Sequence, residues 1–131
     1  MTQKQIKIAI VGTGAIAREH AQALKELPNR ASLFAAADLD KDCLSEFTQK
    51  YGIAVSSTDP HKVITHPDVD LVVVATPPVN HEETVFAALE AKKYVLCEKP
   101  LAANLHAADK IIKKANHYQN RLTVGYQLRY G

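Results

Sequence analysis

The sequence predicts an α/β fold: a doubly wound parallel sheet of about six strands with helices on both faces. Short apolar runs, rich in β-branched residues, alternate along the chain with longer segments of helical periodicity. Strands and helices that alternate in this way build parallel sheets through right-handed crossovers. With 131 residues, 47% of them hydrophobic, the chain can bury the core of one such domain.

Six apolar runs are the expected strands. Residues 6–11 (IKIAIV) and 70–76 (DLVVVAT) are nearly continuous apolar runs, which suit strands that are buried on both faces. The full set of expected strands is residues 6–11, 33–37, 53–56, 70–76, 94–97 and 122–126.

Helices with capping signals separate these strands. Asp40 can cap a helix that stops near Gly52, Thr58-Asp59-Pro60 reads as an N-cap followed by proline in the first turn, and Asn104 can cap the last helix. The expected inward-facing residues are Ile16, Ala17, Ala21, Leu24 and Leu27 in a first helix that stops near Pro28; Val85, Ala88 and Leu89 in a helix over 81–93; and Leu105, Ala108, Ile111, Ile112 and Ala115 in the last helix.

Composition argues against several classes of partner. The net charge of +2 is small and scattered, which does not favour nucleic acid or a membrane surface, and no apolar stretch approaches the roughly 20 residues that span a bilayer. The first residues lead straight into the first expected strand, so no signal peptide is expected. Cys43 and Cys97 are expected to be reduced thiols in a cytoplasmic protein. The histidines show no two-ligand spacing, so no metal site is expected.

The first expected strand runs directly into a G-x-G-x-x-A turn over residues 12–17. Gly12 permits the tight turn, Gly14 leaves room for the backbone to approach a pyrophosphate, and Ala17 lets the following helix sit close to the strand. The N–H groups at the start of that helix have no intrahelical partners, and the helix dipole favours an anion there. The turn therefore predicts a phosphate-binding loop.

Asp38 ends the next expected strand, 24 residues after Gly14. This is close to the spacing of about 20 residues expected for a carboxylate that binds an adenosine ribose. The plainer alternative is an ordinary α/β turn followed by a solvated aspartate. The order of strand, turn, helix, strand and acid favours a dinucleotide site.

Three further motifs follow expected strands, at the sheet edge where doubly wound folds bind ligands. Two have plainer alternatives: the prolines after the fourth strand can form a rigid loop, and the charges after the fifth can form a solvated ion pair. The motifs are Thr76-Pro77-Pro78 with Asn80 and His81, then Glu98-Lys99-Pro100, then Gln127-Leu128-Arg129.

The residues around Asp38 predict NAD(H) rather than NADP(H). Asp38 is followed by Leu39 and Asp40, with no arginine there to receive a 2′-phosphate. Two carboxylates near that phosphate would repel it by about 1–3 kcal/mol in a partly exposed site. NADP is the less favoured cofactor.

The sequence resembles the N-terminal domain of the Gfo/Idh/MocA oxidoreductases. The resemblance spans essentially the whole chain, in the order that the family shows, and the E-K-P motif after ATPP-x-x-H is specific among dinucleotide-binding folds. The matching segments are GTGAIA at 12–17, Asp38, ATPPVNH at 75–81, CEKPLA at 97–102 and VGYQLRY at 124–130.

The resemblance implies a Rossmann domain of a nicotinamide-dependent enzyme that acts on a sugar, polyol or related secondary alcohol by hydride transfer. It implies Lys99 as the catalytic residue, which reaches the substrate hydroxyl or carbonyl, and Asp38 as the ligand of the adenosine ribose. The family often has Asn in place of Gln127, so the role of Gln127 is less defined. The other implied cofactor contacts are Gly12, Thr13, Gly14, Ala15 and Ile16 at the pyrophosphate; Thr76, Pro77 and His81 near the nicotinamide-side ribose; Glu98 with Lys99 beside the nicotinamide; and Gln127 with Arg129 at the last strand.

Family members continue into a second α/β domain that supplies most of the substrate pocket and the oligomer interface. The resemblance therefore implies that residues 1–131 are a truncated or excised N-terminal half, inactive alone, of an enzyme that forms homo-oligomers. Its expected partner is a small sugar or polyol, with neither nucleic acid nor membrane involved. The alternative left open is a non-catalytic nucleotide-sensing or regulatory protein-interaction module.

Overall fold

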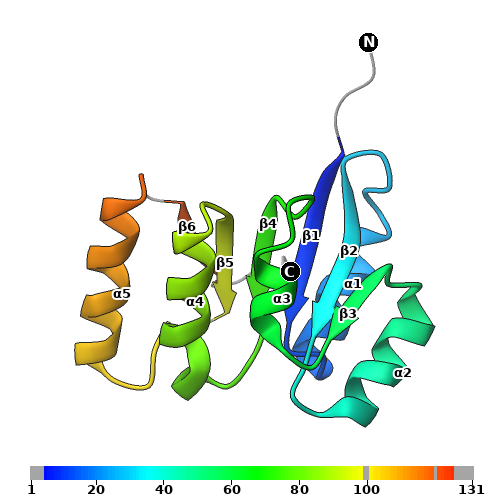
Figure 1. Cartoon of the computed structure of the whole chain (residues 1–131), viewed down its shortest axis with the longest axis horizontal. Helices are drawn as coiled ribbons and strands as arrows, with labels where there is room; N and C mark the ends of the chain where they lie inside the picture. The colour runs from blue at the N-terminus through cyan, green and yellow to red at the C-terminus, as the bar shows by residue number, and fades with distance from the viewer. Residues whose placement is uncertain (1–4, 99–100, 120, 126–131) are drawn as a thin grey trace.

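The protein folds as a six-stranded, all-parallel sheet with helices on both faces (Figure 1). The structure is a computed structural model that describes residues 5–98, 101–119 and 121–125. The strands, in chain order, are β1 (Ile6–Val11), β2 (Ala31–Ala37), β3 (Val55–Ser57), β4 (Leu71–Val74), β5 (Tyr94–Glu98) and β6 (Leu122–Gly125). The helices are α1 (Ala15–Leu24), α2 (Lys41–Tyr51), α3 (Pro60–Ile64), the 3₁₀ turn η1 (Pro78–Asn80), α4 (His81–Glu90) and α5 (Leu105–His117).

The strand order is β3-β2-β1-β4-β5-β6, which reverses direction at β1. β1 pairs with β2 on one side and with β4 on the other, all parallel. The chain therefore leaves β1 toward one edge of the sheet and returns to build the other half from β4. In sheets of this kind the crevice for a ligand opens at the carboxyl ends of the strands beside the switch in order.

Two cores lie on opposite faces of the sheet. On one face, Ala17 and Ala21 of α1 and Leu44 and Phe47 of α2 pack against the sheet. On the other face the sheet is covered by apolar residues of α3, α4 and α5, including the fully buried Leu89. The small side chain of Ala17, with no exposed surface, lets α1 sit directly on the strands. The fold class predicted from the sequence is confirmed.

The third strand begins later than the sequence predicts. β3 covers Val55–Ser57 rather than residues 53–56, because Ile53 still belongs to the ending of α2. Gly52 closes that helix in the left-handed region, and the Ile53 N–H donates to the Thr48 carbonyl oxygen at 3.1 Å. This pairing is the usual helix ending that a glycine at this position makes.

Two predicted helix faces are partly wrong. α1 ends at Leu24, and Leu27 lies outside it and half exposed, because the residue before a proline is disfavoured in the helical region. In α5, Ile111 and Ala115 are buried, but Leu105 is 89% exposed and Ile112 is 50% exposed. With about 3.6 residues per turn, Leu105 and Ile112 share a strip beside the buried face rather than on it. Ile16, in the first turn of α1, is also exposed.

The predicted caps are confirmed. The Asp40 carboxylate accepts from the N–H groups of Asp42 and Cys43, and Asp59 accepts from the N–H of His61 with Pro60 in the first turn. Asn104 accepts from the N–H of Ala107 at the start of α5. These caps satisfy donors that an uncapped helix leaves without partners.

Gly12 is the position where the fold most needs a glycine. Its φ is +98°, and a Cβ there would lie 2.7 Å from the Ala75 carbonyl oxygen. Gly52 has a φ of +64° but open space around the same position. Gly12 therefore combines a conformational demand with a close backbone contact, whereas Gly52 has only the first.

We expect Gly12→Ala to lower the free energy of unfolding by about 2–6 kcal/mol, the sum of backbone strain and overpacking. Gly52→Ala, the matched control, should cost about 1–2 kcal/mol because only the left-handed backbone is strained there. Urea unfolding of both variants measures the difference. Equal losses would show that the Ala75 contact yields easily.

Candidate active site

The glycine turn presents an open helix start at the carboxyl edge of the sheet. Gly14 is the N-cap of α1; it makes no side-chain cap, and the first turn carries no acidic residue. Gly14, Ala15 and Ile16 are exposed, and a Cβ built on Gly14 meets no atom within 4 Å. The backbone N–H groups of this turn are therefore accessible to a ligand that carries negative charge.

Asp38 is tied to the glycine turn by a double hydrogen bond. Its Oδ2 accepts from the Thr13 N–H at 2.8 Å and from the Thr13 hydroxyl at 2.6 Å. Its Oδ1 accepts from the Asp40 N–H at 2.8 Å. The turn after β1 and the end of β2 are thus held together through this carboxylate, which lies half-buried at the same edge.

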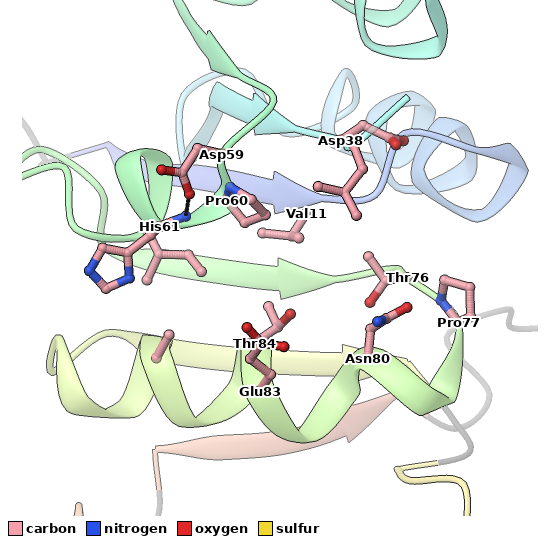
Figure 2. Close-up of a pocket in the computed structure, with 13 residues that line it drawn as sticks. Val11, Asp38, Asp59, Pro60, His61, Thr76, Pro77, Asn80, Glu83 and Thr84 are labelled. Carbon is pink, nitrogen blue, oxygen red and sulfur yellow. Dashed lines mark hydrogen bonds between the residues drawn. The ribbon is translucent and has the colours of Figure 1, made fainter. Parts of the chain in front are cut away.

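A pocket of about 280 Å³ opens between the ends of β1 and β4 and the helices α3 and α4. Figure 2 shows Asp38, Thr76 and Pro77 on the side toward which the β1 and β4 arrows point. The wall on the α3 side carries Asp59, which also caps that helix, and Leu39 lines the pocket next to Asp38. The pocket therefore joins two of the predicted motifs, those at Asp38 and at Thr76.

Among the described residues, the pocket lining carries three carboxylates and no lysine or arginine. Asp38, Asp59 and Glu83 contribute carboxylates to its lining. The hydroxyl oxygen of Thr76 is buried and has no hydrogen-bond partner among the described residues. A buried polar group without a partner costs about 1–3 kcal/mol. The lining suits a neutral ligand rich in hydrogen-bond donors better than an anion.

His81 lies behind the pocket rather than in its lining. The side chain is 1% exposed, and its Nε2 lies 2.6 Å from the Thr76 carbonyl oxygen. Its Nδ1 lies 3.1 Å from the Leu101 carbonyl oxygen and 3.3 Å from the Cys97 sulfur. His81 thus links the segments that follow β4 and β5, and it supports the backbone of Thr76. A direct contact of the imidazole with a cofactor stays a prediction.

A family model described as "Oxidoreductase family, NAD-binding Rossmann fold", the Gfo/Idh/MocA model, matches residues 6–126. The chain belongs to this family. The resemblance seen in the sequence, the assignment as the cofactor-binding domain of an oxidoreductase and the prediction of NAD as cofactor are confirmed.

Similar proteins include two inositol dehydrogenases. Myo-inositol 2-dehydrogenase of Thermotoga maritima is 37% identical over 95% of this chain and 37% of that protein. Inositol 2-dehydrogenase of Acidothermus cellulolyticus is 33% identical over 98% of this chain and 38% of that protein. The chain thus spans less than two fifths of the length of these relatives.

A solved structure shows the same fold with its ligands. Scyllo-inositol dehydrogenase of Lactobacillus casei, with bound cofactor NAD(H) and scyllo-inositol, superposes with a TM-score of 0.88 at 27% identity. The match covers 98% of this chain and 38% of that one. The doubly wound sheet is therefore the NAD-binding Rossmann fold that the family shares.

Sequence reasoning missed His20, which pairs with a predicted site residue. On α1, His20 Nε2 lies 2.5 Å from the Glu98 Oε2 at the end of β5, and both side chains are largely buried. The two residues are 78 positions apart in the sequence, so no local sequence pattern predicts that they pair. Only the packing of α1 beside β5 could have revealed it.

Three predicted site residues, Lys99, Gln127 and Arg129, lie outside the described residues. Within the described ranges no cluster of three or more His, Cys, Asp or Glu side chains could hold a metal ion. The helices of those ranges also include none that is long and apolar enough to cross a membrane.

The two cysteines differ in environment. Burial first, and then the charge of Glu98, raise the pKa of the Cys97 thiol to about 12. Cys97 has no exposed surface, whereas Cys43 is only partly buried beside Thr13. Since the thiolate is the reactive form, Cys97 is inert near neutral pH.

We expect iodoacetamide at pH 8 to modify Cys43 alone in the folded protein and both thiols in urea, as counted by mass spectrometry. A Cys43→Ser variant is the control and should take up no label while folded. Rapid labelling of Cys97 in that variant would contradict the buried, protonated thiol.

Proposed function

We propose that this chain is the cofactor-binding half of an NAD-dependent dehydrogenase that oxidises a secondary alcohol of a cyclic polyol such as an inositol. The observation that carries the proposal is the joined site at the sheet edge: the open start of α1, the Asp38 carboxylate and the adjoining pocket. The polyol substrate is supported by the inositol dehydrogenases that the chain resembles over nearly its whole length.

Different described residues are proposed to bind different parts of the cofactor. The N–H groups around Gly14 would hold the pyrophosphate, and Asp38 would accept from the hydroxyls of the adenosine ribose. The adenine would enter the pocket between Leu39 and α4, where Asp59 and Glu83 can accept hydrogen bonds from its amino group.

The same lining supports NAD over NADP. A phosphate on the adenosine ribose would lie beside Asp38, with Asp59 and Glu83 on the opposite walls of the pocket. Asp40, whose N–H donates to Asp38, adds another carboxylate nearby. Repulsion of about 1–3 kcal/mol follows for a partly exposed site.

Lys99 remains the proposed catalytic residue. Oxidation of an alcohol needs loss of the hydroxyl proton, and the nicotinamide, when bound, takes up the hydride. A lysine beside the nicotinamide cation experiences repulsion and desolvation, which lower its pKa toward a useful range. Glu98, which precedes Lys99, is held in place by His20. Gln127 and Arg129 are proposed to complete the cofactor pocket.

We extend the proposal to the setting of the whole enzyme. Two free thiols fit a reducing compartment, which supports a cytoplasmic location. The family resemblance supports a second domain that supplies the substrate pocket and the interface of a homo-oligomer.

Gly14→Val should abolish NADH binding and leave the fold intact, because a Cβ at Gly14 meets no atom within 4 Å and the isopropyl group would occupy the path of the pyrophosphate. Valine is a poorer N-cap than glycine, so a stability loss of up to about 1 kcal/mol is expected. Titration calorimetry with NADH measures binding, and thermal unfolding checks the fold.

Ala23→Val is the matched control for Gly14→Val, because it places the same isopropyl group on the same helix. Ala23 is exposed near the far end of α1 and is absent from the pocket lining, so NADH affinity should be unchanged. Valine inside a helix is less favourable than alanine by about 0.5 kcal/mol. The stability loss of Ala23→Val therefore measures what an isopropyl group costs α1 away from the cofactor site. Normal NADH binding by Gly14→Val would remove the α1 start from the cofactor site.

Lys99→Ala, made in a two-domain enzyme that carries this chain, should lower kcat with myo-inositol and NAD by roughly 10²–10⁴, the usual range for a general acid–base group. Affinity for NADH should stay within about tenfold, because the pyrophosphate and ribose contacts are untouched. Steady-state kinetics and NADH fluorescence titration test the two halves separately. A near-normal kcat would move the catalytic role to another residue.

A further inference from the structure

Thr13 has an unusual place in the glycine turn. Its side chain has no exposed surface, although Gly14, Ala15 and Ile16 directly after it are exposed. A ligand that approaches the turn meets the backbone of those three residues first. The Thr13 hydroxyl faces inward, away from the surface that a pyrophosphate would contact, so a different role is needed for it.

The hydroxyl of Thr13 has one proton and two acceptors within reach. The Asp38 Oδ2 lies at 2.6 Å and the Cys43 sulfur at 3.3 Å. The shorter bond to a carboxylate is the stronger one, so the proton goes to Asp38. The Cys43 thiol can then donate to the Thr13 carbonyl oxygen, also at 3.3 Å. Cys43 of α2 thus fixes the position of Thr13, and Thr13 in turn fixes the position of Asp38.

Among the described residues, the Asp38 carboxylate receives three donors: the N–H and hydroxyl of Thr13 on Oδ2 and the Asp40 N–H on Oδ1. A carboxylate has about four acceptor positions, so roughly one remains for a ribose hydroxyl. The three donors also fix the rotamer. The negative charge is therefore held at the edge of the pocket and cannot swing away from a neighbouring anion.

We propose that Thr13 is a positioning residue for cofactor selection: its hydroxyl fixes the Asp38 carboxylate that accepts the ribose of NAD and rejects the phosphate of NADP. This inference rests on the proposed function of the site. A 2′-phosphate would meet a carboxylate that cannot rotate aside, and a ribose would meet an acceptor already in place. Preorganisation of this kind improves affinity for the matching ligand without a new contact.

Thr13→Val removes the hydroxyl but keeps the side-chain size and the backbone N–H that binds Asp38. The ratio of the NADPH and NADH dissociation constants should fall about tenfold, because the carboxylate loses its shortest hydrogen bond, keeps only the N–H groups of Thr13 and Asp40, and can turn from the phosphate more readily. Thr13→Ser keeps the hydroxyl, so its ratio of dissociation constants should stay within about threefold of that of the unmodified chain. The probes are NADH and NADPH, each titrated by calorimetry into the 131-residue chain.

The ratio of the NADPH and NADH dissociation constants distinguishes the positioning role of Thr13 from direct binding of the pyrophosphate and from a purely structural role. A Thr13 that bound the pyrophosphate directly would make Thr13→Val weaken NADH and NADPH equally, and a purely structural Thr13 would lower only the unfolding temperature. Either result, with an unchanged ratio, overturns the inference and leaves the proposed function standing. Absence of binding of both dinucleotides to the unmodified chain would instead overturn the proposed function and the inference with it.

A double-mutant cycle with Asp38→Asn tests whether Thr13 acts through Asp38. Once Asp38→Asn has removed the charge, adding Thr13→Val should change the ratio by less than about twofold. An undiminished tenfold effect in the Asp38→Asn background would refute the inference. Thr13→Cys, a weak donor of similar size, gives the same comparison if the valine variant does not fold.

Discussion

The site depends on the close approach of the turn after β1 to the backbone at the end of β4. The Gly12 N–H donates to the Ala37 carbonyl oxygen on one side, and the Ala75 N–H donates to the Val11 carbonyl oxygen on the other, each at 2.8 Å. A Cβ on Gly12 would lie 2.7 Å from the Ala75 oxygen. Only glycine lets the loops that carry Thr13 and Thr76 meet at this distance, and their meeting forms the crevice at the switch in strand order.

Much of the fold could be predicted from the sequence because its signals are local. Apolar runs, caps such as Asp40 and Asn104, and the helix stop at Gly52 act within a few residues. The errors came where a second interaction outweighed the pattern. The bond of Ile53 to the end of α2 delays β3, and the strip of α5 that contains Leu105 has no covering element among the described residues.

The sequence predicts where the candidate site lies, but it does not predict the hydrogen bonds that join the site residues to one another. The sequence predicts the glycine turn from its motif, Asp38 from its spacing and the Thr76 loop from its place after a strand, and the structure brings them to one edge. The bonds between them join residues far apart: Thr13 to Asp38 over 25 positions and His20 to Glu98 over 78. The first pair follows from the pairing of β1 with β2, which sets Val11 opposite Ala37, and the second follows from how α1 sits on the sheet. A pattern in one stretch of chain contains no information about that packing.

The charges of the site vary along its length in a way that matches one kind of ligand. At the start of α1, uncapped at Gly14, the helix dipole and free N–H groups favour an anion. In the adjoining pocket, Asp38, Asp59 and Glu83 disfavour one. A ligand suits both regions only if its negative charge is confined to one segment and the next is neutral and rich in donors. NAD has this distribution, with a pyrophosphate followed by a neutral adenosine. With the cofactor placed as proposed, NADP would bring a second anion among the carboxylates, so the layout that suits the dinucleotide also favours NAD over NADP.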